Sequence, residues 1–172
     1  MNIKRYSLIF ICLAFCFVLT SNLACVETSS MSPIEQEEEQ VRQRASEYIK
    51  VIENIINGTG DRTENAHLYA QYRYPPVSSQ TGWDSIYSYI DSCEPYHGVI
   101  ERIYSSVNYV MVDDTMQHAQ VVVTKITKRI GQPTEDSPIG KLDSSSFILI
   151  WFKTNGQWYY DLRASVEAQE ST

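Results

Sequence analysis

A few positions of this chain could support general acid–base chemistry. Asp161 and His97 each follow a tyrosine, and His118 comes shortly after an expected hairpin turn. Such a group becomes catalytic when it faces a dry pocket that brings its pKa near the working pH. A strand-end carboxylate and surface histidines are the ordinary interpretation of the same residues. Asp161 and His97 are therefore weak catalytic candidates, and the sequence favours a protein that is not an enzyme.

Metal and phosphate chemistry have less support. Asp91, Cys93, Glu94 and His97 form a small polar cluster whose Cys-x₃-His spacing occurs in zinc sites, but a second ligand pair is missing. The end of a helix would explain the same cluster. The chain contains no Gly-x-Ser-x-Gly motif and no glycine-rich phosphate loop. We therefore expect no metal site and no cofactor.

Aromatic residues offer a better basis for binding. The chain has 12 Tyr and 3 Trp, and these side chains can line a small-molecule cavity while presenting a polar tip. Packing in a core is their commoner use, and both interpretations stay open. The candidate pocket residues on the expected helices and strands are Tyr48, Tyr69, Tyr72, Trp83, Tyr87, Tyr104, Trp151 and Trp158.

A long helix over residues 33–56 is the best supported of the elements that must position these residues. Ser32 and Glu35 have the spacing of a capping box around Pro33. Apolar residues then recur at three- and four-residue steps, which gives the helix one buried face. Asn57-Gly58 provides the stop signal.

Two shorter helices are expected next. The first covers 63–73 with Thr63 as its cap, and it ends before Pro75-Pro76 because a residue that precedes proline disfavours the helical region. The second begins with Thr81 as its cap and buries Trp83 among other apolar residues.

The period of the apolar residues changes from 3.6 to 2 after Pro95, which predicts strands. The runs 98–112, 116–130, 145–154 and 157–164 are rich in β-branched and aromatic residues. Asp113-Asp114 and Asn155-Gly156 separate paired runs as hairpin turns. Helices followed by antiparallel strands predict an α+β domain with the helices on one face of a curved sheet.

The third strand run is apolar on both faces. Phe147, Leu149 and Trp151 share one face, and the alternate residues Ile148 and Ile150 share the other. A sheet of this kind needs a second covering layer or a partner. We expect a homodimer, and the alternative is a cover formed by the loop 131–144 or by the C-terminal segment. The alternation leaves open which face is concave.

The order of these elements over residues 33–163 resembles the nuclear transport factor 2-like (NTF2-like) superfamily. The resemblance rests on the long first helix, on the junction Tyr72-Arg73-Tyr74-Pro75 and on the closing hairpin from Phe147 to Asp161. It implies a cone-like curved antiparallel sheet, with the long N-terminal helix across its open side and a pocket between them. It also implies dimers formed through the outer sheet face. The fold serves many unrelated functions, so it does not indicate an activity.

Ketosteroid isomerases and polyketide cyclases belong to this superfamily and use an Asp or His base with a Tyr or acid as a hydrogen-bond donor. No family catalytic motif matches this sequence residue by residue. The resemblance therefore leaves an isomerase- or cyclase-like enzyme with Asp161 or His97 as its base as an alternative to binding alone.

The first 24 residues have the layout of a secretory signal peptide. Lys4 and Arg5 precede an apolar stretch that is too short for an ordinary membrane span. Leu23-Ala24-Cys25 resembles the lipobox of bacterial lipoproteins, although Asn22 stands where leucine is usual. Cys25 is therefore the candidate lipidated residue. The alternatives are an uncleaved N-terminal anchor and ordinary cleavage that leaves Cys25 as a thiol.

The expected organisation is a signal peptide at 1–24, a tether at 25–32, the domain at 33–164 and a flexible tail at 165–172. The net charge of −7 excludes non-specific binding of nucleic acid. We expect an exported protein of the bacterial cell envelope, anchored to the membrane by lipid at Cys25, or else secreted or periplasmic. Its expected role is non-catalytic binding of a small apolar ligand or a protein partner. A purely protein-interaction or dimerisation module is a further alternative.

Overall fold

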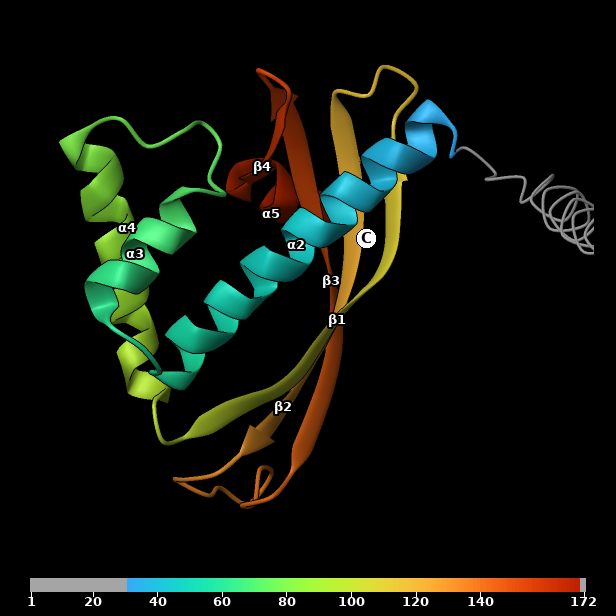
Figure 1. Ribbon diagram of the computed structural model, residues 1–172. Helices are drawn as coiled ribbons and strands as arrows, with labels where there is room; N and C mark the ends of the chain where they lie inside the picture. Colours follow the sequence, from blue (N-terminus) through green and yellow to red (C-terminus); the bar gives the residue numbers. More distant parts are fainter. Residues whose placement is uncertain (1–30, 171–172) are drawn as a thin grey trace, which may run out of the picture. The chain divides into compact units, whose positions relative to one another are not determined.

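A long helix, α2, crosses one face of a four-stranded antiparallel sheet (Figure 1). The computed structural model describes residues 31–170, so the predicted signal peptide and Cys25 lie outside the described residues. Helix α2 spans Pro33–Asn57, which confirms the predicted helix. Gly58, with a φ of 66°, follows its last residue and stops it. Its apolar stripe is buried against the sheet. The buried residues of α2 are Val41, Ala45, Tyr48, Ile49, Val51, Ile52 and Ile55.

The short helices α3 and α4 lie side by side next to the C-terminal half of α2 (Figure 1). Helix α3 is Arg62–Ala70, α4 is Gln80–Cys93, and a 3₁₀ turn, η1, follows at Glu94–Tyr96. Within residues 31–170, no helix is long and apolar enough to cross a membrane.

The caps of the short helices lie two residues before the predicted ones. Asp61 accepts a hydrogen bond from the Glu64 amide, and Ser79 accepts one from the Gly82 amide. The predictions of Thr63 and Thr81 as caps were therefore wrong. In both helices the extended backbone of the earlier residue places its side-chain oxygen over the first free amides.

The strands pair in chain order. They are β1 at Ile100–Val112, β2 at His118–Arg129, β3 at Leu142–Thr154 and β4 at Gln157–Asp161. Two register shifts in β1, each equivalent to a β-bulge, occur between Arg102 and Tyr104 and between Val107 and Tyr109. Bulges increase the local bend and twist of a strand. The sheet therefore curves where β1 passes along α2.

The C-terminal segment is a helix, α5 at Leu162–Glu170, where a flexible tail from residue 165 was predicted. Asp161 begins this helix by accepting a hydrogen bond from the Ala164 amide at 2.9 Å. The Ser165 hydroxyl accepts a hydrogen bond from the Ile150 amide at 2.8 Å. Strand β4 is too short to pair with all of β3, so α5 occupies the edge of β3 beyond Asp161. The helix thus satisfies a backbone group that a flexible tail would leave free.

The inner face of the sheet, which packs against α2, carries Phe147, Leu149 and Trp151. Val121 and Val123 of β2 lie beside them in the same core. The structure therefore shows that the face with Phe147, Leu149 and Trp151 is the concave one. Ile148 and Ile150 lie on the opposite, outer face.

The N-terminal turn of α2 is anchored to the β3–β4 hairpin by a partly buried ion pair. The Glu37 carboxylate contacts the Lys153 ammonium and accepts a hydrogen bond from the Trp158 indole nitrogen at 2.9 Å. The Arg44 guanidinium, two turns further along α2, donates to the Trp158 and Gln71 carbonyl oxygens. These contacts fix the direction in which α2 crosses the sheet.

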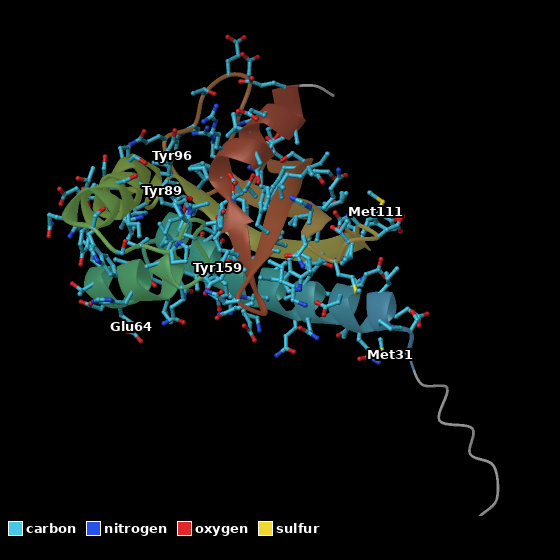
Figure 2. All side chains as sticks on the ribbon, turned by 90° about the horizontal axis from the view of Figure 1, so that it is seen from above. Met31, Glu64, Tyr89, Tyr96, Met111 and Tyr159 are labelled. Carbon is cyan, nitrogen blue, oxygen red and sulfur yellow. The ribbon has the colours of Figure 1, made fainter. Side chains whose placement is uncertain are left out.

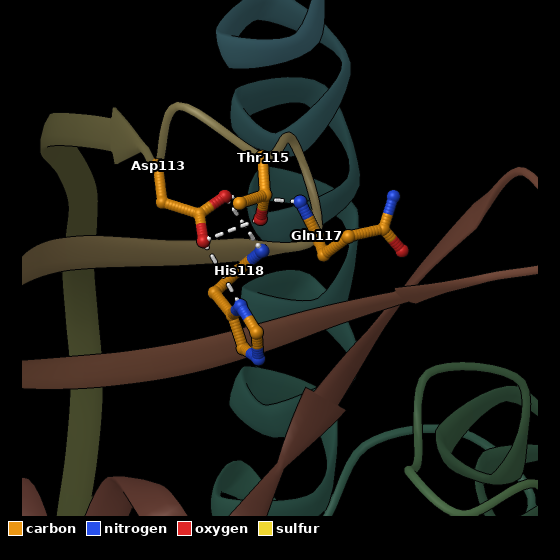
Figure 3. A network of polar contacts seen from close by, with 4 residues as sticks. All are labelled: Asp113, Thr115, Gln117 and His118. Carbon is orange, nitrogen blue, oxygen red and sulfur yellow. Dashed lines mark hydrogen bonds and ion pairs between the residues drawn. The ribbon is translucent and has the colours of Figure 1, made fainter.

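The β1–β2 turn is organised by one carboxylate (Figure 3). The Asp113 side chain accepts hydrogen bonds from the Gln117 and His118 amides at 3.0 and 3.2 Å, and from the Thr115 hydroxyl at 2.8 Å. The His118 ring nitrogen Nδ1 lies 3.0 Å from the same carboxylate. Partial desolvation raises the pKa of Asp113, but these hydrogen bonds outweigh it and hold the pKa well below its ordinary value of 3.8. His118, the first residue of β2, thus helps to close the turn.

We expect Asp113→Ala to lower the melting temperature by a few degrees at pH 7. A carboxyl whose folded pKa is lowered stabilises the protein above its ordinary pKa and loses that effect as the pH falls through the folded value. The difference between the two proteins should therefore shrink below about pH 4. Melting curves from pH 7 to pH 2 test this. A difference that stays constant across this range would contradict the assigned role of the carboxylate.

Candidate functional site

A cavity of about 440 Å³ lies between the C-terminal half of α2 and the inner face of the sheet. Residues from all four strands line it, together with residues from α2, α4 and α5. This volume is in the range of small-molecule sites. Ser145, Ser146 and Gln169 are exposed at its margin, so the cavity opens to solvent there.

One wall of the cavity is apolar. Ile49, Ile52 and Ile56 come from successive turns of α2, and Phe147 and Leu149 face them from β3. The helical and strand periods place these residues on facing surfaces. This wall suits the hydrocarbon part of a ligand.

The end of the cavity nearest the core carries tyrosine hydroxyls. The rings of Tyr48 and Tyr160 lie 4.7 Å apart between centroids, and Tyr89 of α4 completes this part of the lining. Burial, and then the neighbouring Tyr69, raise the pKa of Tyr160 to about 12 and that of Tyr48 well above its ordinary value. These phenols therefore stay protonated at neutral pH and can donate hydrogen bonds.

Two cationic side chains, Arg102 of β1 and Lys125 of β2, also line the cavity, and Arg102 is near enough to Tyr89 and Tyr48 to interact with them electrostatically. Burial lowers the pKa of both groups, and the charge of Arg102 lowers that of Lys125 further. The Lys125 ammonium lies 5.7 Å from the centroid of the Phe147 ring. The cavity thus combines an apolar wall with phenolic hydroxyls and two cationic side chains.

Tyr48 is the only predicted pocket residue among the described residues that line this cavity. Tyr104 is exposed on the outer sheet face, and Trp83 lines a separate surface hollow beside His67. Tyr87 packs on α4 against Trp83 and the Arg62 guanidinium. The other four predicted residues are buried in the core and fill it with aromatic rings: Tyr69, Tyr72, Trp151 and Trp158.

Arg102 and Lys125 were not among the predicted site residues, because that prediction was based on aromatic and acid–base side chains. A signal for Lys125 does exist in the sequence. The inward positions Val121, Val123 and Lys125 alternate along one strand, so a charged residue occupies a position that the pattern assigns to the inside. The bulge next to Arg102 interrupts the same alternation in β1, so the period gives no equivalent signal there.

The two weak catalytic candidates have structural partners elsewhere. Asp161 begins α5, as described above, and His97 Nε2 lies 2.9 Å from the Ile55 carbonyl oxygen. Among the described residues that line the cavity, none is Asp, Glu or His. The structure therefore does not bring a carboxylate or imidazole base together with the cavity tyrosines.

The polar cluster around Cys93 is also accounted for by local contacts. The Nε and Nη2 groups of Arg62 donate to the two Asp91 carboxylate oxygens at 2.7 Å, which links α4 to α3, and Cys93 is buried. In the part of the chain that the structure describes, no three His, Cys, Asp or Glu side chains are grouped closely enough to hold a metal ion.

No protein-family model matches the chain, and no curated protein matches it. Solved structures show a distant similarity to it. An NTF2-like protein with a cystatin-like fold from Novosphingobium aromaticivorans is 12% identical with a TM-score of 0.47, and the match covers 78% of this chain and 88% of that one. The association domain of CaMKII from C. elegans is 11% identical with a TM-score of 0.43, over 73% of this chain and 93% of that one.

The intermembrane space region of the chloroplast protein ARC6 is 12% identical with a TM-score of 0.39, over 70% of this chain and 92% of that one. The coordinates themselves establish the architecture. A long helix across the inner face, two short helices beside it and a curved antiparallel sheet in the order β1-β2-β3-β4 match the predicted arrangement. The domain that begins at Pro33 therefore has the α+β architecture that the resemblance to the NTF2-like superfamily implied.

Proposed function

We propose that this protein binds a small molecule with a large apolar part in the cavity between α2 and the sheet, and does not transform it. The observation that carries the proposal is the apolar wall formed by Ile49, Ile52, Phe147 and Leu149 around a space of about 440 Å³. Cavities of this size and lining bury most of the surface of a small ligand. The raised pKa of the cavity tyrosines favours hydrogen-bond donation over proton abstraction.

We expect Ile52→Trp to weaken binding of the neutral fluorophore N-phenyl-1-naphthylamine by about tenfold or more. The indole would occupy the cavity beside the other α2 residues and exclude the fluorophore. Fluorescence titration of the purified full-length chain measures the change. The matched control is Ile139→Trp, which makes the same substitution at an exposed position in the β2–β3 loop. Equal binding by both variants would contradict the proposal.

We propose, as a second function, that the outer sheet face associates with another copy of the chain. Tyr104, Tyr109 and Met111 of β1 are 53%, 55% and 44% exposed, although large apolar side chains on a sheet are usually covered. The paired residues of β2 and β3 continue this surface with Val122, Ile148 and Ile150. Depletion of charged residues at the centre of a surface is typical of interfaces.

We expect the wild-type chain to sediment as a dimer and Ile150→Glu to sediment as a monomer. A glutamate at the centre of the outer face would be buried without a partner in the dimer. Ile139→Glu is the control, because it adds the same charge at an exposed position in the β2–β3 loop. A monomeric wild-type chain, or a dimer that Ile150→Glu leaves intact, would contradict this interface.

We also propose that the protein is exported and carries lipid at Cys25. The support is the layout of residues 1–24 and the Leu23-Ala24-Cys25 junction in the sequence. Stable anchoring to a bilayer requires more than one lipid chain, which a lipidated N-terminal cysteine would provide.

We expect Cys25→Ala to move the protein from the membrane fraction to the soluble fraction of its host cells. Fractionation followed by immunoblotting measures the distribution. Cys93→Ala is the control, because Cys93 is buried in the domain and has no place in the proposed anchor. Retention of Cys25→Ala in the membrane fraction would refute lipid anchoring at this residue.

A further inference from the structure

We infer that the ligand of the cavity is an amphipathic anion, with its acidic group at Arg102 and Lys125 and its apolar body along α2 and β3. This inference rests on the proposed binding function and names the class of ligand. The shared chemistry is an unbranched or aromatic apolar body that ends in a carboxylate or a similar oxyanion.

The two cations share one end of the cavity because of the register of the sheet. Lys125 pairs with Ser105 of β1 on one side and with Ser145 of β3 on the other. Phe147 lies two residues further along β3, and successive inward positions on a strand are about 6.6 Å apart. The cationic end is therefore one inward step beyond the apolar wall.

Neither cation is neutralised within residues 31–170. Arg102 and Lys125 form no ion pair with any described residue, whereas Arg62, Lys153 and Arg163 each pair with a carboxylate. Glu53 of α2 acts on Arg102 electrostatically, but from beyond ion-pair distance. Among the described residues that line this cavity, none is acidic.

Hydrogen-bond donors at this end also lack acceptors. Arg102 Nε and the Ser105 hydroxyl are buried, and neither has a hydrogen-bond partner among the described residues. Buried polar groups are normally paired, so these donors and the two adjacent positive charges favour an oxyanion as the missing partner. An anion would reduce both the desolvation penalty and the repulsion between the cations.

The length of the cavity fits a single apolar body. The β3 residues that line the cavity run from Ser145, which pairs with Lys125, to Leu149. This stretch of strand corresponds to about 13 Å. The apolar wall along this stretch suits the chain of a medium-length carboxylic acid.

Competition between decanoate and 1-decanol for bound N-phenyl-1-naphthylamine tests the inference. These compounds have the same chain length and differ in the charge of the end group. We expect the full-length chain to bind decanoate at least about tenfold more tightly than decanol, as for hydrogen bonds to a charged group. The variant carrying both Arg102→Gln and Lys125→Gln should lose this preference and still bind decanol.

Three controls separate charge from structure. Lys128→Gln removes one charge from the same strand at a position outside the cavity lining, and it should keep the preference. Arg102→Lys keeps the charge at the site and should retain most of the preference. Lys125→Gln alone should reduce the preference even if the double variant does not fold.

The outcomes distinguish this inference from the proposed function. Equal affinity of the wild-type chain for decanoate and decanol, or a preference that the Gln variants retain, would overturn the anion site and leave ligand binding intact. Failure of both compounds to displace the fluorophore, together with equal fluorophore binding by Ile52→Trp and Ile139→Trp, would refute the cavity as a binding site.

Discussion

Burial of the apolar stripe of α2 against the curved inner face of the sheet is the constraint on which this domain depends. The stripe packs on Val121, Val123, Leu149 and Trp151, which are almost completely buried. The described domain has a single cysteine, Cys93, and so cannot form a disulfide within itself. A domain of this length must therefore rely on such a core. The Glu37–Lys153 ion pair then holds the start of the helix over the β3–β4 hairpin.

The cavity is a consequence of the same packing. Aromatic rings fill the space around Trp151 and Tyr160. Nearer the start of β3, the inward position is Ser145, and its partner in β2 is Lys125. Small and charged side chains cannot continue a close-packed apolar layer. The core therefore ends at Phe147, and the space beyond it, under the C-terminal half of α2, carries the two cations.

The two faces and the edge of the sheet differ in what covers them. Helix α2 covers the inner face, α5 binds the part of the β3 edge that β4 leaves unpaired, and the outer face keeps Tyr109 and Met111 exposed. Figure 2 shows that Met111 lies at the end of the domain where α2 begins, whereas Tyr89 of α4 lies toward the other end. The proposed interface is on the outer sheet face and the proposed ligand site is on the inner face, so the two can be tested independently.

Local sequence determined the elements, because helical and strand periods, Asn155-Gly156 and Gly58 act over a few residues. The bounds of α2 and the four strands were close to the predicted ones for this reason. The predicted tail was wrong because α5 is fixed by the contact of Ser165 with Ile150, which are far apart in the chain.

The candidate site depended on long-range placement. Periodicity states which residues share a face of a strand, but it does not state which face meets α2. Because one face packs against α2, Tyr104 is exposed, Trp151 is in the core, and Lys125 and Arg102 line the same cavity. The sequence by itself therefore determined the helices, the strands and their order, whereas only the tertiary structure decided where the charges lie, because strand register and helix packing join residues that no local pattern connects.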